Sequence, residues 1–329
     1  MNVLNNLSFA VIAFIGGMLA LQENSAITVG IIVIFAEYSR QFTRPLNDLA
    51  NQFNTLLSAV AGAERVFEVL DEKEEVDRKQ TSTLHEIRGD VTFKDVDFSY
   101  GDESKTISKV SFDVKAGEMV ALVGPTGAGK TTIINLLSRF YEPKSGEILL
   151  DGTPISNYKR EELRKEMGFV LQDSFLFQAT IRENIRYGRL NATDDEVEEA
   201  ARKANAYSFI KQLPDGFDTM LDQEGSGISQ GQKQLLSISR AILVNPSILI
   251  LDEATSNIDT ITEMKIQEAL RRLMKGRTSF VIAHRLNTIQ EADHILVLQE
   301  GEIVEQGSHE ELIQKGGLYS SMNEKGSDS

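Results

Sequence analysis

The sequence contains no cysteine, which excludes disulfide bonds and cysteine-ligated metal centres. Histidine is scarce as well, and the four residues at positions 85, 284, 294 and 309 lie too far apart for the spacing of a zinc site. Basic residues are outnumbered: 34 Lys and Arg against 49 Asp and Glu give a net charge of −15, of which residues 1–66 carry only −1. Because non-specific nucleic-acid binding relies on a basic surface, we expect no nucleic-acid partner.

Charged residues are also missing from two apolar runs, Leu7–Leu21 and Ala26–Ala36. Each run is shorter than the roughly 20 residues that span a bilayer as a helix. Three interpretations compete: a signal peptide, a buried helical hairpin, or a transmembrane hairpin. Residues 1–7 contain no Lys or Arg, which disfavours a signal peptide. Arg40, Arg44 and Arg65 all follow the second run, so the positive-inside rule favours a transmembrane hairpin with everything after Arg40 in the cytoplasm.

The residues after the second run predict an amphipathic helix over 46–67, because apolar residues recur there at steps of three and four. They are Leu46, Leu49, Phe53, Leu56, Leu57, Val60 and Ala63. Pro45 either starts or kinks this helix, which we expect to continue the second apolar run. The charged stretch Asp71–Lys79 then reads as solvated chain, within a linker over residues 71–90.

From Val91 the pattern changes to short apolar strands that alternate with helical segments. The expected strands include Met119–Val123, Gly168–Leu171, Ile248–Leu251, Ser279–Ile282 and His294–Leu298. This alternation predicts an α/β domain with a largely parallel core sheet and an antiparallel edge.

A phosphate loop follows the first of those strands. Residues Gly124–Thr131 read Gly-Pro-Thr-Gly-Ala-Gly-Lys-Thr, and a helical stretch over 132–139 comes next. This is the G-x-x-x-x-G-K-[ST] pattern in its required strand–loop–helix context. Its glycines let backbone N–H groups wrap phosphate oxygens at a helix N-terminus. Lys130 is expected to reach the β- and γ-phosphates, and the Thr131 hydroxyl to bind Mg²⁺.

Polar residues end three further strands of the expected sheet. Asp252 and Glu253 follow Ile248–Leu251, and Asp252 can hold Mg²⁺ while Glu253 orients or deprotonates the attacking water. His284 suits a γ-phosphate contact, and Gln172 is a fourth polar side chain at a strand end. Taken singly, each of these is more often a simple strand terminus, so their weight comes from the phosphate loop beside them.

The segment from Gly225 to Ala241 does not read as core. It predicts a helix that starts at Ser229, with Gln232 completing a capping box. Such a helix N-terminus suits an anion, although nothing in the spacing requires it to face phosphate.

Together these motifs resemble the ATP-binding cassette family over Val91 to about Met322. Tyr100 matches the aromatic residue that stacks on adenine, Gln172 the Q-loop glutamine, Glu253 the catalytic glutamate and His284 the switch histidine. Gly124–Thr131 matches Walker A, Ile228–Gln232 the signature, Ile248–Asp252 Walker B and Ser256–Asp259 the D-loop.

The resemblance implies a P-loop NTPase cassette at 91–324 and a tail at 325–329, with an antiparallel β subdomain and an α-helical signature subdomain. Its implied cofactors are ATP and Mg²⁺, with Glu253, His284 and Gln172 catalytic and with Thr131, Gln172 and Asp252 on the metal. The implied ATP contacts are Tyr100, Gly124, Pro125, Thr126, Gly127, Ala128, Gly129, Lys130, Thr131 and Thr132. A second chain would contribute Ser229, Gln230, Gly231, Gln232 and Asp259 to the same ATP.

Residues 1–70 resemble the last two transmembrane helices and the pore-exit helix of type IV exporters, the multidrug and lipid class. The stretches over 38–46 and 61–70 carry this resemblance. It implies a cell-membrane, multi-pass half-transporter with a cytoplasmic cassette, a second half-transporter chain as partner, contact with membrane lipid, and a drug, lipid or peptide as cargo. Half-transporters of this class have six transmembrane helices before the cassette, and this chain resembles only the last two. The resemblance therefore implies that the chain is a C-terminal fragment.

Two departures from the family pattern stand out. Gln230 occupies a position where the signature usually has Gly, and Gln223-Glu224 precedes it in an unusual order. A soluble cassette ATPase and a nucleotide-binding regulatory module remain as alternatives. The apolar hairpin argues against the first alternative, and Glu253 and His284 argue against the second.

Overall fold

The computed structural model describes residues 2–22, 26–72, 74–75, 77, 87–101, 106–171, 175–222, 227–252, 258–283 and 286–327. The chain forms two compact units, Met1–Val76 and Asp77–Ser329. Gln172, Glu253 and His284, the three residues expected to be catalytic, lie outside the described residues.

The first unit is a hairpin of helices α1 (Asn2–Ala20) and α2 (Val29–Leu70). Thr28 caps α2 by accepting a hydrogen bond from the Ile31 N–H at 3.4 Å. The helices approach closely at Gly16, where a Cβ atom would lie 2.9 Å from Ile32 Cγ1. Within the described part of the chain, no helix combines the length and the apolar character needed to cross a membrane.

Helix α2 confirms the expected continuation of the second apolar run and corrects its detail. Pro45 lies inside the helix and does not start it. A proline removes one helical hydrogen bond, but α2 continues on both sides of Pro45. The apolar residues that predicted the amphipathic face are exposed, namely Leu49, Phe53, Leu56, Leu57 and Val60.

The second unit contains two sheets. Four antiparallel strands in the order β2-β1-β4-β5 form the smaller one: β1 (Val91–Phe98), β2 (Ile107–Val114), β4 (Ser145–Leu150) and β5 (Thr153–Pro154). The larger sheet has the order β10-β9-β3-β8-β7-β6. Its strands are β3 (Met119–Val123), β6 (Met167–Val170), β7 (Ile248–Asp252), β8 (Thr278–Ile282), β9 (His294–Gln299) and β10 (Glu302–Gly307).

The pairing of these strands confirms the expected α/β sheet. Strands β9, β3, β8, β7 and β6 are parallel, and β10 pairs antiparallel with β9 at one edge. The carboxyl ends of β3, β8, β7 and β6 therefore lie at one edge of the sheet, in that order.

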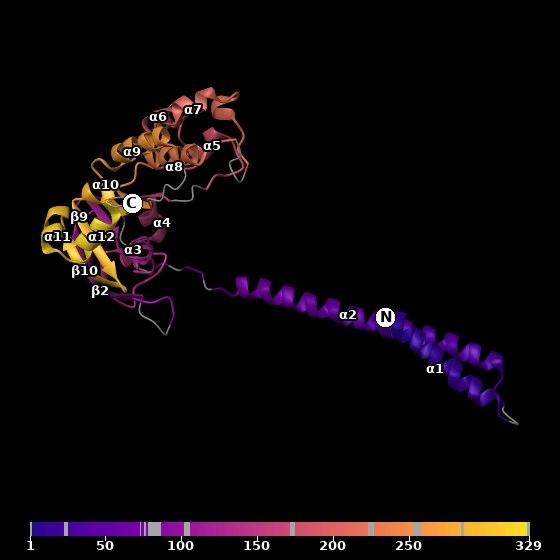
Figure 1. Cartoon of the computed structure of the whole chain (residues 1–329). Coiled ribbons are helices and arrows are strands. Elements are labelled where there is room, and N and C mark those ends of the chain that lie inside the picture. The colour runs from indigo at the N-terminus through magenta and orange to yellow at the C-terminus, as the bar shows by residue number, and fades with distance from the viewer. Residues whose placement is uncertain are drawn as a thin grey trace. The chain divides into compact units, whose positions relative to one another are not determined.

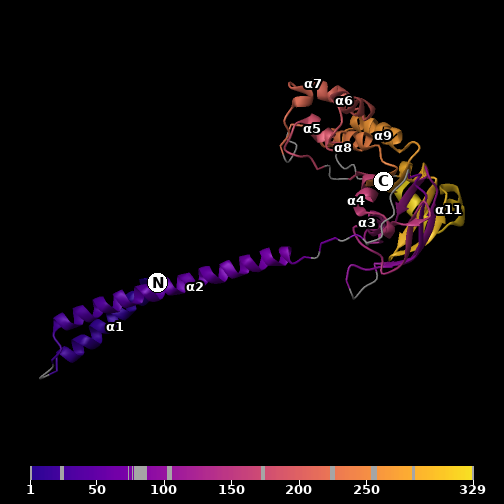
Figure 2. The ribbon, with the colours of Figure 1, turned by 180° about the vertical axis from the view of Figure 1, so that it is seen from behind.

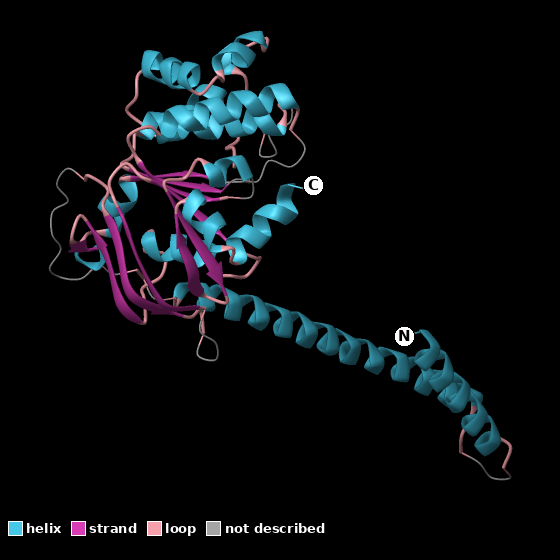
Figure 3. Ribbon diagram, turned by 60° about the vertical axis from the view of Figure 1, so that its left-hand side comes forward, coloured by secondary structure: helices cyan, strands magenta, loops and turns pink. Residues whose placement is uncertain are grey.

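Helices of the second unit fall into groups. Helices α5 (Ile181–Arg186), α6 (Asp194–Lys203), α7 (Tyr207–Gln212), α8 (Gln230–Val244) and α9 (Thr260–Met274) lie together in both Figure 1 and Figure 2. Figure 3 shows the strands, in magenta, on one side of this helical group. The others are α3 (Lys130–Leu137), α4 (Arg160–Lys165), α10 (Leu286–Gln290), α11 (His309–Lys315) and α12 (Leu318–Ser327), with the short helices η1 (Ile155–Asn157) and η2 (Gly216–Asp218).

Two hydrophobic cores flank the parallel sheet, because successive strand residues face opposite sides. In β3, Val120 and Leu122 pack with the antiparallel sheet and α3. Ala121 and Val123 pack with the helical group on the other side. The same alternation holds in β7 and β9. Packing on both faces thus holds the sheet in place, together with the edge where the parallel strands end.

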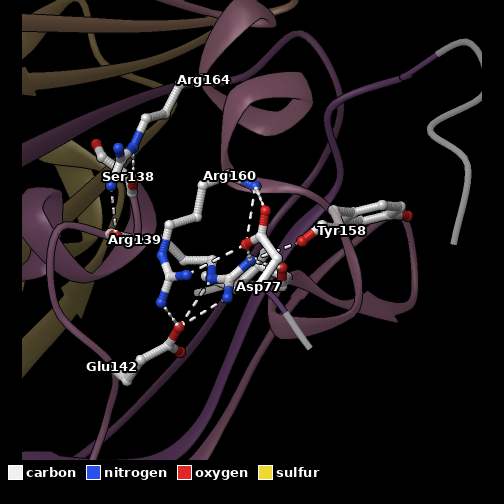
Figure 4. A network of polar contacts seen from close by, with 8 residues as sticks. Asp77, Ser138, Arg139, Glu142, Tyr158, Arg160 and Arg164 are labelled. Carbon is white, nitrogen blue, oxygen red and sulfur yellow. Dashed lines mark hydrogen bonds and ion pairs between the residues drawn. The ribbon is translucent and has the colours of Figure 1, made fainter. Parts of the chain in front are cut away.

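A charge network around the buried Arg139 holds Asp77 at the start of the second unit (Figure 4). The Asp77 carboxylate accepts a hydrogen bond from Arg160 Nη1 at 3.2 Å and lies 3.7 Å from Arg139 Nη1. Arg139 is 2% exposed and also donates to Glu142 Oε1 at 2.8 Å and to the Tyr158 carbonyl at 2.7 Å. A buried guanidinium needs such partners on every side. The expectation that Asp71–Lys79 is merely solvated is therefore wrong at Asp77.

Candidate functional site

The phosphate loop joins β3 to α3 through backbone conformations that favour glycine. Gly124, Gly127 and Gly129 have φ angles of +151°, +83° and +104°. A Cβ atom at Gly124 would lie 2.2 Å from the Leu298 carbonyl oxygen, so the loop also has no room for a side chain there. The loop is held to the β9–β10 hairpin by a hydrogen bond from Gly301 N–H to the Ala128 carbonyl at 3.1 Å. These glycines keep the loop tight enough for its N–H groups to converge.

Lys130 folds back over the loop that precedes it. Its Nζ donates to the carbonyl oxygens of Gly124 at 2.7 Å and Pro125 at 3.0 Å, and the residue is 9% exposed. Burial lowers the pKa of Lys130 below the ordinary lysine value, and the charge of Asp252 opposes this shift. The ammonium group is thus held at the loop by two neutral carbonyls, which anionic phosphate oxygens can replace with stronger, charge-assisted bonds.

The first turn of α3 offers donors for the same anion. Gly129 is the N-cap residue, and no side chain caps the helix. The N–H groups of the first turn of a helix have no intrahelical acceptor, and the helix dipole adds partial positive charge. Thr131 lies exposed in this turn. The N–H groups of this turn and the Lys130 ammonium group are therefore donors of the kind that a triphosphate needs.

Asp252 supplies the carboxylate that a metal site beside the loop needs. It ends β7, pairs with Ile282 of β8 in the sheet, and is partly buried. Strand β8 in turn lies between β7 and β3, so Asp252 reaches the edge where the phosphate loop begins. A carboxylate and a threonine hydroxyl are oxygen ligands of the kind that Mg²⁺ prefers, and phosphates complete its coordination. Asp252 and Thr131 thus fit the predicted metal.

Tyr100 stands at the expected base end of the site. Its hydroxyl lies 3.2 Å from the Thr132 hydroxyl on α3, so it is linked to the helix that carries the phosphate loop. Its ring packs edge-to-face against Phe98 and Tyr141, with ring centroids 4.9 Å apart in each pair. The side chain remains 52% exposed, as a stacking surface must be.

Gln172, Glu253 and His284 each come one or two residues after a described strand in the sequence. Strands β6, β7 and β8, which lead directly to 172, 253 and 284, are adjacent and parallel. The carboxyl ends of these three strands therefore lie at the same edge of the sheet. The roles of Gln172, Glu253 and His284 themselves stay predictions, because these residues lie outside the described ranges.

The signature segment, Ile228–Gln232, contains the predicted capping box. Ser229 Oγ accepts from the Gln232 N–H at 3.2 Å, and Gln232 Oε1 accepts from the Ser229 N–H at 2.8 Å. Ser229 and Gln230 are exposed, whereas Gly231 is buried. A Cβ atom at Gly231 would lie 2.4 Å from Thr262 Cγ2 on α9. Packing against α9 of the same chain is therefore enough to require glycine at position 231.

Asp259 caps α9, and it is the residue predicted to contact the nucleotide that a second chain binds. Its carboxylate accepts a hydrogen bond from the Thr262 N–H at 3.0 Å, and this bond lowers the pKa of Asp259 below the ordinary value. The N-termini of α8 and α9 thus meet, through Gly231 and Thr262, at one place on the helical group.

Sequence reasoning passed over Arg240 of α8. Its guanidinium donates to the Asn184 carbonyl at 2.6 Å, to the Asn184 Oδ1 at 2.5 Å and to the Phe175 carbonyl at 2.5 Å. It thus binds the signature helix to the segment that follows Gln172. The sequence shows only an arginine in a helix of mixed polar and apolar residues, which does not identify a partner.

Known proteins resemble this chain over nearly all of its length. An ABC transporter ATP-binding protein of Bacillus subtilis is 65% identical over 325 residues, which cover 98% of this chain and 54% of the relative. The fatty acid ABC transporter ATP-binding/permease protein of Mycobacterium tuberculosis is 50% identical over 319 residues, which cover 97% of this chain and 50% of the relative. The chain thus spans about half the length of the curated relatives it matches.

A solved structure and a family model agree with these relatives. A bacterial Atm1-family ABC exporter with ATP bound superposes with a TM-score of 0.73 at 40% identity, over 98% of this chain and 55% of that one. The family model described as ABC transporter matches residues 107–256, from β2 through the phosphate loop to just beyond Asp252. The phosphate loop, the strand order and these matches together confirm the resemblance read from the sequence: the chain belongs to the ABC transporter family.

Proposed function

We propose that this chain binds and hydrolyses ATP and that it couples hydrolysis to export across a membrane. The observation that carries the proposal is the arrangement of Lys130, the uncapped first turn of α3 and Asp252 around one loop. This arrangement supplies cationic and N–H donors for a triphosphate and a carboxylate for its metal.

In this proposal each strand end has a role. Lys130 and the loop N–H groups bind the phosphates, and Tyr100 stacks on the base. Thr131, Asp252 and Gln172 hold Mg²⁺, which neutralises phosphate charge when bound. Glu253 orients the attacking water and accepts its proton, while His284 contacts the γ-phosphate.

We further propose a head-to-tail pair of cassettes, in which Ser229, Gln230, Gly231, Gln232 and Asp259 of one chain complete the ATP site of the other. The exposure of Ser229 and Gln230 at a helix N-terminus supports this. The proposed organisation is a partial transmembrane domain at 1–70, a linker at 71–90, the cassette at 91–324 and a tail at 325–329, in a cell membrane with the cassette in the cytoplasm. The name of the mycobacterial relative supports a lipid as the exported cargo, with a drug or peptide as the other candidates.

Two substitutions test the ATPase proposal. Lys130→Ala should abolish ATP binding, because it removes the ammonium group at the loop, whereas Lys115→Ala, an exposed control, should not. Glu253→Gln should keep ATP affinity and lose most of the hydrolysis. Equilibrium binding and phosphate release in the assembled transporter measure both. Near wild-type turnover in Glu253→Gln would show that the base is another residue.

A further inference from the structure

The Tyr100 hydroxyl is held by two side chains of α3. Thr132 Oγ1 lies 3.2 Å from the phenol oxygen, and Asn135 Nδ2 donates a hydrogen bond to it at 3.1 Å. Thr132 and Asn135 are three positions apart on a helix, so they lie on the same face. The three side chains connect a loop of the antiparallel sheet to the helix of the phosphate loop.

The ring of Tyr100 is fixed at the same time. Phe98 and Tyr141 meet it at interplanar angles of 86° and 89°, the edge-to-face geometry that aromatic pairs favour. Two perpendicular rings limit the tilt of the Tyr100 ring, and the hydrogen bonds at its far end limit its rotation.

The two ends of the nucleotide site come from different sheets. The phosphate loop follows β3 of the parallel sheet, whereas Tyr100 follows β1 of the antiparallel sheet. The base and the triphosphate of ATP are joined through a single ribose, so the two subsites must keep a fixed separation. A bond between Tyr100 and α3 holds that separation before the ligand arrives, which lowers the cost of binding.

We propose that Asn135 is a positioning residue for the nucleobase, acting through the Tyr100 hydroxyl. Thr132 is itself expected to contact the nucleotide, so Asn135 is the one of the two whose bond the ligand need not displace. The ligand class is a nucleoside triphosphate whose base stacks on Tyr100, and the inference rests on the proposed ATP binding.

The test compares two ligands that share the phosphates and differ in the base. Asn135→Ala should weaken ATP binding by about three- to tenfold, the loss expected for one hydrogen bond. It should leave inorganic tripolyphosphate affinity within about twofold of wild type. Asn191→Ala, the same substitution at an exposed position between α5 and α6, is the control and should change neither. Calorimetry on the whole chain measures both affinities.

A second variant separates positioning from stability. In a Tyr100→Phe background, which lacks the phenol oxygen, Asn135→Ala should have no further effect on ATP affinity. An equal loss of ATP and tripolyphosphate affinity in Asn135→Ala would mean that the residue supports α3 alone, and would overturn the inference. The same holds for an undiminished effect in the Tyr100→Phe background. A wild-type chain that binds neither ligand would overturn the proposed function itself.

Discussion

The N-termini of α3 and α8 are built in opposite ways, although both are expected to meet the same kind of anion. Helix α3 begins at Lys130, after an N-cap residue, Gly129, that has a left-handed conformation and no side chain to cap the helix. Helix α8 begins at Gln230, after the N-cap residue Ser229, whose capping box with Gln232 already satisfies two N–H groups. The first leaves its backbone donors to a ligand, whereas the second gives two of them to its own side chains.

Within the proposed pair of chains, this difference would give the two helix N-termini different roles. A helix N-terminus with free N–H groups, a lysine and a carboxylate for the metal can bind a triphosphate alone. A capped N-terminus keeps the dipole and an exposed hydroxyl but fewer donors, so it suits a secondary contact with a phosphate that is already bound. The contrast agrees with a site in which one chain binds ATP and a second chain only completes the contact.

The largest effect is expected at the start of the phosphate loop. Gly124→Ala places a Cβ atom against the Leu298 carbonyl at a φ of +151°. It should lower the free energy of unfolding by at least about 2 kcal/mol and ATP affinity by roughly tenfold or more. Gly117→Ala is the matched control, since its φ is +86° but no atom lies within 4 Å of the added Cβ. Thermal unfolding and calorimetry compare them, and equal losses of affinity would contradict the contact argument.

A smaller effect is expected in the signature segment. Gly231→Ala pushes a methyl group against Thr262 Cγ2 and should cost about 1–3 kcal/mol of stability. Thr262→Ser removes that methyl and keeps the hydroxyl, so the double variant should recover part of the stability. Chemical unfolding of all three variants is the measurement. If Thr262→Ser gives no recovery, packing between α8 and α9 does not explain the glycine.

The cap of α8 allows a matched comparison. Ser229→Ala should cost about 1 kcal/mol of stability and should leave ATP binding to a single chain unchanged. Ser308→Ala removes an equivalent capping box from α11 and serves as the control. Both should destabilise to a similar extent, but only Ser229→Ala should reduce hydrolysis in the assembled dimer. An equal reduction of hydrolysis in both variants would remove the evidence for a role of Ser229 at phosphate.

The smallest effect concerns acid stability. The Thr262 N–H bond depresses the pKa of Asp259 in the folded chain, so its contribution to stability is present above the ordinary aspartate pKa of about 3.9 and is lost as pH falls through the folded value. Asp259→Asn retains an N-cap acceptor but does not titrate. Its unfolding free energy should therefore fall slightly less than that of wild type on acidification, as denaturation curves from pH 7 to pH 3 would record. A steeper fall would contradict the assignment.

Local patterns sufficed for much of the fold. The strand–loop–helix motif around Gly124–Thr131 and the capping box at Ser229 are encoded by neighbouring residues, so both were predictable. The alternation of strands and helices predicted a largely parallel sheet with an antiparallel edge, whereas the order of its strands comes from the structure. Helix α3 runs from Lys130 to Leu137, so both of its ends lie two residues before the expected positions.

Contacts between distant segments were not predictable. Nothing near Asn135 indicates a bond to Tyr100, and nothing near Gly231 indicates the methyl group of Thr262. Asp77 sits in a charged stretch that resembles solvated chain, and only the folded unit brings Arg139 and Arg160 to it. Each of these depends on tertiary structure, which single-sequence periodicity does not report.

Because residues of β3 alternate between two cores, the strand should tolerate some insertions of residues better than others. Val120 and Leu122 face one core while Ala121 and Val123 face the other, so the insertion of one residue would exchange the two sets and expose each to the wrong neighbours. A single residue inserted into β3 is therefore expected to disrupt the two cores more than an inserted pair. The number of residues in β3 thus also fixes where Gly124 and the phosphate loop begin relative to the two cores.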